Sequence, residues 1–219
     1  MIKTLFLHVP LGVLLAAVSS LALSQQAGQA ELSPNHQESR QSHAAQALPQ
    51  SYQEFKTRYQ REAQTPEGAV KMYFVAVFSY INESTRAEGA KMLRYAMHLD
   101  RPLKNSINYV TFMERLEDDE ENHIFRSFAV GTSPENDYRM SPEDFELMIV
   151  SRKKEIDYTR MMLHSSGADS PRPVWVKEYD GLWYTINNAS TYLRVRPPRA
   201  AIEKRKNAHD ADYDNVPSK

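Results

Sequence analysis

The amino-acid sequence predicts an α+β domain, in which about three N-terminal helices pack on a C-terminal antiparallel sheet of about four strands. Two observations predict this class. Apolar residues recur at helical spacing up to residue 116, and from residue 145 they alternate at the spacing of a strand. In addition, Asp180-Gly181 lies between two runs of β-branched and aromatic residues, which is a strong hairpin signal. Helices followed by a strand meander fit this class best.

The central helix is predicted over residues 65–81. Thr65 is suited to the N-cap, Pro66 to the first helical position, and Glu67 to the positive end of the helix dipole. The following residues are apolar on nearly every side, which is typical of a helix in the middle of a core. Two further helices are expected after it, over residues 85–98 and 106–116, and the apolar stripe of residues 51–64 indicates a short additional helix before it.

Four strands are predicted after residue 144. The first covers residues 145–150, the charged residues 152–155 form a turn, and the second covers 156–164 with a bulge near Thr159. The last two, residues 174–179 and 182–186, form a hairpin with a type I′ turn at Asp180-Gly181. The predicted register pairs Tyr179 with Leu182, Lys177 with Tyr184, and Trp175 with Ile186.

Composition excludes several classes of function. The chain of 219 residues has no cysteine, which excludes disulfides, thiolate catalysis and cysteine-ligated zinc. The net charge of −1 provides no strong field toward nucleic acid. The basic cluster 204–206 is followed by Asp210, Asp212 and Asp214, so a nucleic-acid partner is not expected. The acidic run 117–121 lacks the ligand spacing of a calcium loop, and neither a metal nor another cofactor is expected.

The first 24 residues are predicted to be a cleaved signal peptide. Lys3 precedes an apolar run, and Ala22 and Ser24 provide small residues for cleavage before Gln25. The rival interpretation, an uncleaved anchor, is disfavoured because the run is shorter than the ~20 residues of a spanning helix. Residues 25–50 should be a disordered leader, 51–198 a single domain, and 199–219 a disordered charged tail. The expected localisation is periplasmic or secreted, with no transmembrane span after cleavage.

One loop before the hairpin is the best candidate for a site. Residues 165–173 combine small residues, a carboxylate and a guanidinium, and aromatic residues follow them. The candidate ligand-binding residues are Ser165, Ser166, Asp169, Arg172, Trp175 and Tyr184. Two structural alternatives remain open: an ion pair of Asp169 with Arg172 that pins the loop, and core positions for the aromatic residues. No catalytic residue is predicted, because the residues that follow His164 lack the arrangement of a triad.

Four segments also carry a resemblance. They are Thr65-Pro66-Glu67-Gly68-Ala69, Ser133-Pro134-Glu135-Asn136-Asp137-Tyr138, the loop Ser-Ser-Gly-Ala-Asp-Ser-Pro-Arg-Pro at 165–173, and Arg196-Pro197-Pro198. Their combination resembles an uncharacterised family of exported bacterial proteins, a domain of unknown function. The resemblance implies a bacterial protein and a real domain over about residues 65–198, but no activity.

At the level of fold, a cone-shaped sheet around the first helices, as in nuclear-transport-factor-like domains, is one version of the predicted architecture. Phe74 and Phe78 would then form the floor of a pocket. The sequence therefore predicts an exported binding or envelope-associated domain without catalysis, whose partner is a cell-envelope ligand or protein. The alternative is a small hydrolase that uses the loop 165–172.

Overall fold

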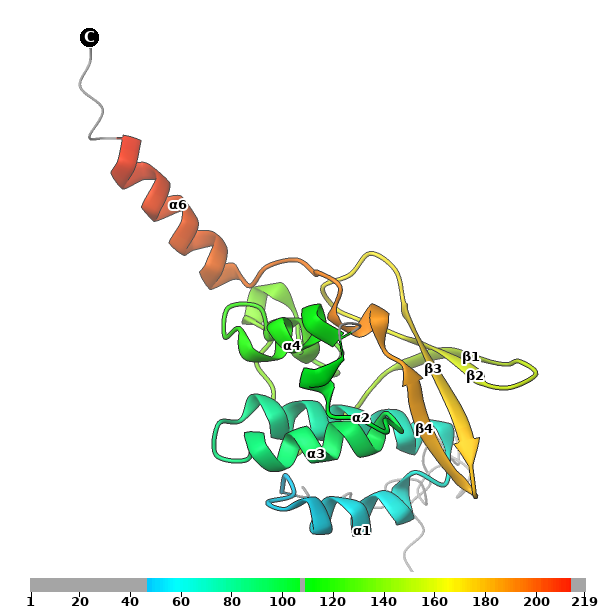
Figure 1. Ribbon diagram of the computed structural model, residues 1–219. Coiled ribbons are helices and arrows are strands. Elements are labelled where there is room, and N and C mark those ends of the chain that lie inside the picture. The colour runs from blue at the N-terminus through cyan, green and yellow to red at the C-terminus, as the bar shows by residue number, and fades with distance from the viewer. Residues whose placement is uncertain (1–46, 107–108, 214–219) are drawn as a thin grey trace, which may run out of the picture. The chain divides into compact units, whose positions relative to one another are not determined.

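The computed structural model describes residues 47–106 and 109–213. Its helices are α1 (Tyr52–Glu62), α2 (Pro66–Ile81), α3 (Arg86–Ala96), α4 (Val110–Glu117), α5 (His123–Arg126) and α6 (Arg199–Tyr213), with short 3-10 turns η2 (Leu103–Asn105), η4 (Pro134–Asn136) and η5 (Ala189–Tyr192). The strands are β1 (Ile149–Lys154), β2 (Thr159–Leu163), β3 (Arg172–Tyr179) and β4 (Leu182–Asn187), which form one antiparallel sheet in this order (Figure 1). The predicted α+β class is confirmed. The predicted signal peptide lies outside the described residues.

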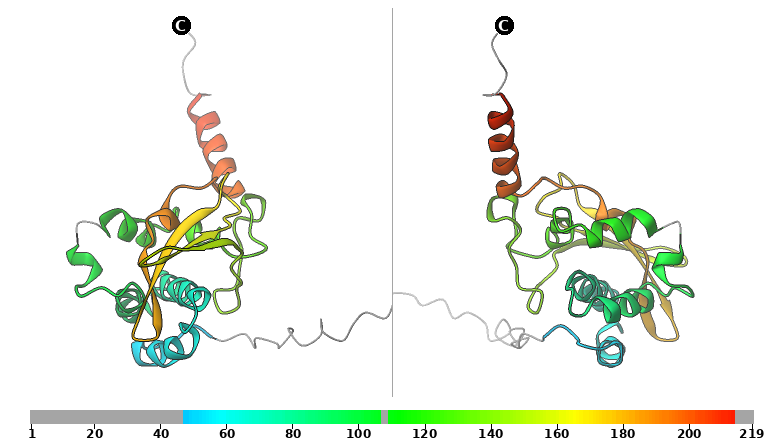
Figure 2. Two further views of the ribbon diagram at one scale, coloured as in Figure 1. Left: turned by 90° about the vertical axis from the view of Figure 1, so that its right-hand side faces the viewer. Right: turned by 60° about the vertical axis from the view of Figure 1, so that its left-hand side comes forward.

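Helix α2 is the centre of the domain. The Thr65 side chain accepts a hydrogen bond from Gly68 N, and Pro66 occupies the first turn, as the sequence predicts. Its side chains are buried without interruption from Met72 to Tyr80. The helix contacts α1, α3 and α4 as well as β3 and β4, so it lies between the other helices and the sheet (Figure 2). Burial on every side stabilises a segment whose β-branched and aromatic residues are only moderate helix formers.

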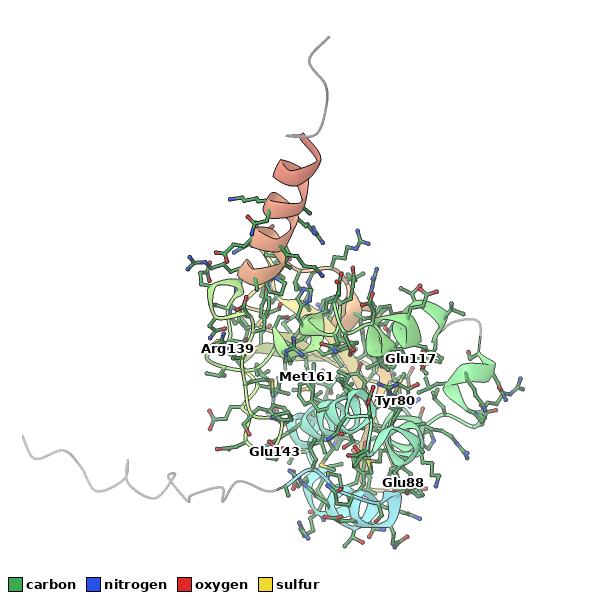
Figure 3. All side chains as sticks on the ribbon, turned by 90° about the vertical axis from the view of Figure 1, so that its left-hand side faces the viewer. Tyr80, Glu88, Glu117, Arg139, Glu143 and Met161 are labelled. Carbon is green, nitrogen blue, oxygen red and sulfur yellow. The ribbon has the colours of Figure 1, made fainter. Side chains whose placement is uncertain are left out.

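The Phe74 and Phe78 side chains belong to the closed core. Phe74 is fully buried and packs on Phe128 with ring centroids 5.2 Å apart, while Phe78 packs edge-on against Phe145 at 5.1 Å. From the sheet, Met161 adds a fully buried side chain to the same core (Figure 3). Phe74 and Phe78 therefore fill the space between helices and sheet, and this differs from the pocket floor that a cone-shaped sheet would give them.

The β1–β2 hairpin differs from its prediction. Arg152, Lys153 and Lys154, which the sequence analysis assigned to a turn, belong to β1, and the turn follows at Glu155, whose N–H donates to Tyr158 O at 2.8 Å. The register shifts between Ile149 and Ser151 rather than near Thr159. β1 lies at the edge of the sheet, where charged side chains are favoured because they discourage pairing with other chains. The three cations therefore have a structural reason to lie in a strand.

The β3–β4 hairpin follows its prediction except at one pair. Asp180 and Gly181 have φ values of 51° and 79°, as a type I′ turn requires. Tyr179 pairs with Leu182 and Lys177 with Tyr184, but Trp175 pairs with Asn187 and not with Ile186. The register shifts between Trp175 and Val176, so β4 contributes one extra residue there. A bulge of this kind has no sequence signal comparable to Asp-Gly.

The other edge of the sheet is covered by α1. Trp183 N donates to the carbonyl of Ala63 at 2.8 Å, and the Tyr59 hydroxyl donates to the carbonyl of Trp183 at 2.6 Å. These bonds pair backbone groups that an edge strand would otherwise leave open. They also place the rings of α1 beside those of β4.

Both ends of the domain differ from the predicted boundaries. Leu48 is buried at 4% exposure, so the ordered part begins before residue 51. Residues 199–213, predicted to be disordered, form α6. Asp137 Oδ1 accepts a hydrogen bond from Ala200 N at 2.9 Å, and Lys204 pairs with Glu120 at 3.1 Å. The prediction relied on the scarcity of apolar residues, whereas Ala, Glu, Lys and Arg are all strong helix formers. Within the described residues, no helix is both long and apolar enough to cross a membrane.

Candidate functional site

Ser165 and Ser166 of the predicted loop take part in a hydroxyl network. Ser165 is 1% exposed, and its Oγ lies 2.8 Å from Ser127 Oγ. Ser166 Oγ donates to the Ser127 carbonyl at 3.1 Å and lies 3.1 Å from Thr132 Oγ1. These bonds join the loop to the end of α5. They satisfy buried polar groups, so they stabilise the fold directly.

Asp169 and Arg172 do not form the predicted ion pair. Asp169 Oδ1 instead binds Arg196 Nη2 at 2.6 Å, and Arg172 Nη2 donates to the carbonyl of Arg194 at 3.4 Å. Both residues therefore hold the segment that leaves η5. The Asp169 side chain is 93% exposed, so solvent screens its pair with Arg196 and the pair adds little to the stability of the fold. The predicted pair of Asp169 with Arg172 is therefore wrong, because each residue binds the segment after η5 instead.

Three of the motifs that carry the family resemblance meet at this segment. The Tyr138 hydroxyl donates to the Arg196 carbonyl at 2.6 Å, and Arg196 N donates to the Gly167 carbonyl at 2.9 Å. A Cβ on Gly167 would lie 2.2 Å from the Tyr138 hydroxyl, so only glycine fits there. Burial raises the pKa of Tyr138 to about 12, so the hydroxyl stays a donor to a higher pH than that of an exposed tyrosine. We call Tyr138, Gly167, Asp169 and Arg196 the clasp.

The geometry of the loop does not resemble a hydrolase site. An activated serine needs a general base within hydrogen-bond reach. Within the described part of the chain, Ser165 Oγ has Ser127 as its partner, and the adjacent His164 is exposed while Ser165 is buried. His123 is the other nearby histidine, and its Nδ1 lies 2.8 Å from the Glu120 carbonyl, with its ring stacked on Tyr138. Among the described side chains, no imidazole is hydrogen-bonded to the hydroxyl of Ser165 or Ser166.

The remaining two predicted residues lie elsewhere. Trp175 is partly buried in β3, where it pairs with Arg160 of β2. Tyr184 is 7% exposed and lies at the turn end of the β3–β4 hairpin, against α1 and the end of α3. The six predicted residues are therefore not brought together. Asp169 and Arg172 hold the segment that leaves η5, Ser165 and Ser166 bind residues that follow α5, and Tyr184 belongs to a separate cluster of aromatic rings.

The cluster around Tyr184 borders a recess of about 670 Å³. The Tyr184 ring stacks on Tyr59 at 5.4 Å, meets Tyr95 edge-on at 5.8 Å, and lies 4.6 Å from the His98 ring. His98 also stacks on Tyr179 at 4.2 Å. The recess itself is lined by Tyr52, Lys91, Arg94, Tyr95, His98, Leu99, Asp100 and Tyr184. We call it the aromatic recess. Its size is within the usual range of ligand sites, and its walls combine aromatic faces with a few charged groups.

An unusual backbone conformation places His98 in this recess. Its φ is 52°, and Leu99 N donates to Arg94 O at 2.9 Å, which is the hydrogen-bond pattern of a helix end closed by a left-handed residue. Glycine normally occupies such a position, because other L-residues pay roughly 1–2 kcal/mol there. In this conformation the His98 imidazole lies over the rings of Tyr179 and Tyr184. Strained residues of this kind concentrate at binding sites.

The buried tyrosines make the stability of the domain sensitive to alkaline pH. Burial, with the neighbouring Tyr184 hydroxyl, raises the pKa of Tyr95 to about 12, and burial also raises the pKa of Tyr59 and Tyr73. A raised tyrosine pKa means that the fold favours the neutral form. Stability is therefore fully present below about pH 10, the pKa of an unfolded tyrosine, and is lost as pH rises through 10 toward 12.

We expect the urea midpoint of unfolding to fall steeply over this pH interval. Tyrosinate absorbance, measured at each pH, should show a late-titrating group of tyrosines that ionise only as the protein unfolds. If all tyrosines ionised near pH 10 in the folded chain, the burial described above would be wrong.

The comparison with known families identifies the domain. The family described as Domain of unknown function (DUF6935) matches residues 47–199. The chain belongs to this family. The match begins at the first described residue, ends at the first residue of α6, and includes both the clasp and the aromatic recess. Searches of the curated proteins and of the solved structures found no match.

In the DUF6935 domain, the sequence analysis missed most of the aromatic recess. Of the residues that line it, only Tyr184 was a predicted site residue. The convergence of Tyr52, Tyr95 and His98 depends on how α1, α3 and β4 pack, and no spacing in the sequence relates these residues. Among the described residues, no group of three or more histidine, aspartate or glutamate side chains is arranged to hold a metal ion.

Proposed function

We propose that this DUF6935 protein is an exported, non-catalytic binding domain of the bacterial cell envelope, with its ligand site in the aromatic recess. The single observation that carries the proposal is the placement of His98 in a strained conformation over two tyrosine rings at the wall of an open recess. Export and bacterial origin are supported by the signal-like residues 1–24 and by the family resemblance.

The walls of the recess define the kind of ligand. Four of its lining residues carry rings, and aromatic faces bind other rings or apolar side chains by stacking. Lys91 and Arg94 at the same recess favour an anionic group. Asp100 is also part of the lining, but it lies beside Arg101, whose Nε is 3.6 Å from its carboxylate. A molecule with a ring and an adjacent negative charge satisfies these walls.

A thermal-shift screen of the chain from Gln25 to Lys219 tests the proposal. The ligands are cell-wall fragments, oligosaccharides, peptides, lipids and divalent metals. A ligand at a hundred times its dissociation constant should stabilise the fold by about 2.7 kcal/mol. We expect a shift with a ring-bearing anionic compound.

The His98→Gly variant provides a matched control, because glycine suits the left-handed conformation and removes the ring. It should unfold at the same or a higher temperature and lose most of the ligand-induced shift. Asp169→Ala, in the clasp, should keep the shift. If His98→Gly bound as well as the wild type, or if only Asp169→Ala lost binding, the recess would not be the ligand site.

A further inference from the structure

A second, smaller recess adjoins the aromatic recess along α3. It measures about 280 Å³, and Ala90, Leu103, Met113 and the Tyr80 ring provide its apolar walls. The Tyr80 hydroxyl donates to Glu117 Oε1 at 2.5 Å, so this carboxylate is already bound; Figure 3 shows the two side chains close together. Methionine adapts its shape readily, which suits a recess for a branched or flexible apolar group.

The two recesses share one wall. Lys91 and Arg94 of α3 line both of them. These residues are three positions apart, so they lie on the same face of the helix. Lys91 pairs with Glu88, and Arg94 Nε donates to the Leu99 carbonyl at 3.3 Å, which uses one of the five donors of a guanidinium. Lys104 adds a further cation to the smaller recess. Lys91 and Arg94 therefore form a ridge of two cationic side chains between an aromatic recess and an aliphatic one.

We propose that the natural ligand of this surface is an acidic peptide segment of a protein partner. One aromatic side chain of the segment occupies the aromatic recess, a carboxylate binds Lys91 and Arg94 on the ridge, and an aliphatic side chain fills the smaller recess. This inference rests on the proposed function, because it assumes that the aromatic recess is a binding site, and it adds the class of the partner.

The shape and polarity of the two recesses favour a peptide. A peptide presents separate side chains along its backbone, and each can enter its own pocket while a charged residue lies between them. A glycan would bring hydroxyl groups to the apolar smaller recess, where lost hydrogen bonds with water would not be replaced. A lipid would need one continuous apolar space, whereas Lys91 and Arg94 divide the surface.

Selection from a library of random heptapeptides displayed on phage, with the chain from Gln25 to Lys219 as the target, tests this inference. We expect the enriched peptides to carry aspartate or glutamate between an aromatic and an aliphatic residue. A synthetic copy of the best peptide should bind at least tenfold more weakly to the Lys91→Glu/Arg94→Glu variant. The same peptide with its acidic residue changed to glutamine should also lose at least tenfold in affinity.

A variant with the same change in net charge provides the control. Lys153→Glu/Lys154→Glu alters two exposed residues of β1 and should bind the peptide like the wild type. Circular dichroism would verify that both variants are folded. Failure to enrich peptides, enrichment of peptides without an acidic residue, or equal binding to both variants would overturn the inference. If a glycan or lipid shifted the melting temperature in a His98-dependent manner while no peptide was enriched, the proposed function would stand and only the peptide would be excluded.

Discussion

The Phe74→Ala variant should lower the free energy of unfolding by about 3–5 kcal/mol. Phe74 is fully buried at the centre of α2, and its ring contacts those of Tyr73, Phe78 and Phe128. Removing the ring loses its burial and leaves a cavity that a helix fixed on all sides cannot fill. Domains of this size are stable by about 5–15 kcal/mol, so the loss is a large fraction of the total. Urea unfolding, followed by circular dichroism, measures it.

This variant also distinguishes two versions of the fold. If the sheet formed an open cone with Phe74 on its pocket floor, truncating the ring would cost little, since part of its surface would already face water. A loss below about 1 kcal/mol would favour that version. The Ile156→Ala variant is the control, because Ile156 is 99% exposed and its truncation should change stability by less than about 0.5 kcal/mol.

Local chemistry explains which parts of the fold were predictable. The start of α2 and the Asp180-Gly181 turn depend on residues whose backbone or capping preferences act within a few positions. The sequence analysis therefore located both correctly. The strand β1 was predicted several residues too early, because its three cations are also typical of a solvated turn. Only the topology of the sheet shows that β1 is an edge strand, where cations discourage pairing with other chains.

The candidate site was less predictable, because it depends on contacts between distant parts of the chain. Tyr52, His98 and Tyr184 lie on α1, after α3 and on β4, and no spacing in the sequence relates them. Only Tyr184 was among the predicted site residues. The loop 165–173 was predicted as a site because it concentrates polar residues. In the structure, however, the Gly167 carbonyl and the Asp169 carboxylate bind Arg196. A dense polar loop is therefore weak support for a binding site.

Gly89 of α3 lies so close to the backbone of α2 that a methyl group at this position would push the two helices apart. A Cβ on Gly89 would lie 2.5 Å from the backbone nitrogen and 2.6 Å from the Cα of Tyr80. Alanine is otherwise the better helix former by about 1 kcal/mol, so the substitution would be stabilising if the two helices were not in close contact. Because the clash is with backbone atoms, no rotamer change can relieve it. We expect Gly89→Ala to destabilise the domain by about 1–3 kcal/mol.

The Ala87→Gly variant, at an exposed position of the same helix, isolates the effect of helix propensity and should cost up to about 1 kcal/mol. Both variants should therefore lower the free energy of unfolding, although one replaces glycine by alanine and the other alanine by glycine. The test is whether Gly89→Ala lowers this free energy or raises it. Gly89 sets the distance between α2 and α3, and α3 carries Lys91, Arg94 and Tyr95 to the aromatic recess. A ligand that depends on His98 should consequently bind Gly89→Ala more weakly even where the variant is folded. If Gly89→Ala were more stable than the wild type, the close approach of the helices would be wrong, and the shared wall of the two recesses would have to be reconsidered.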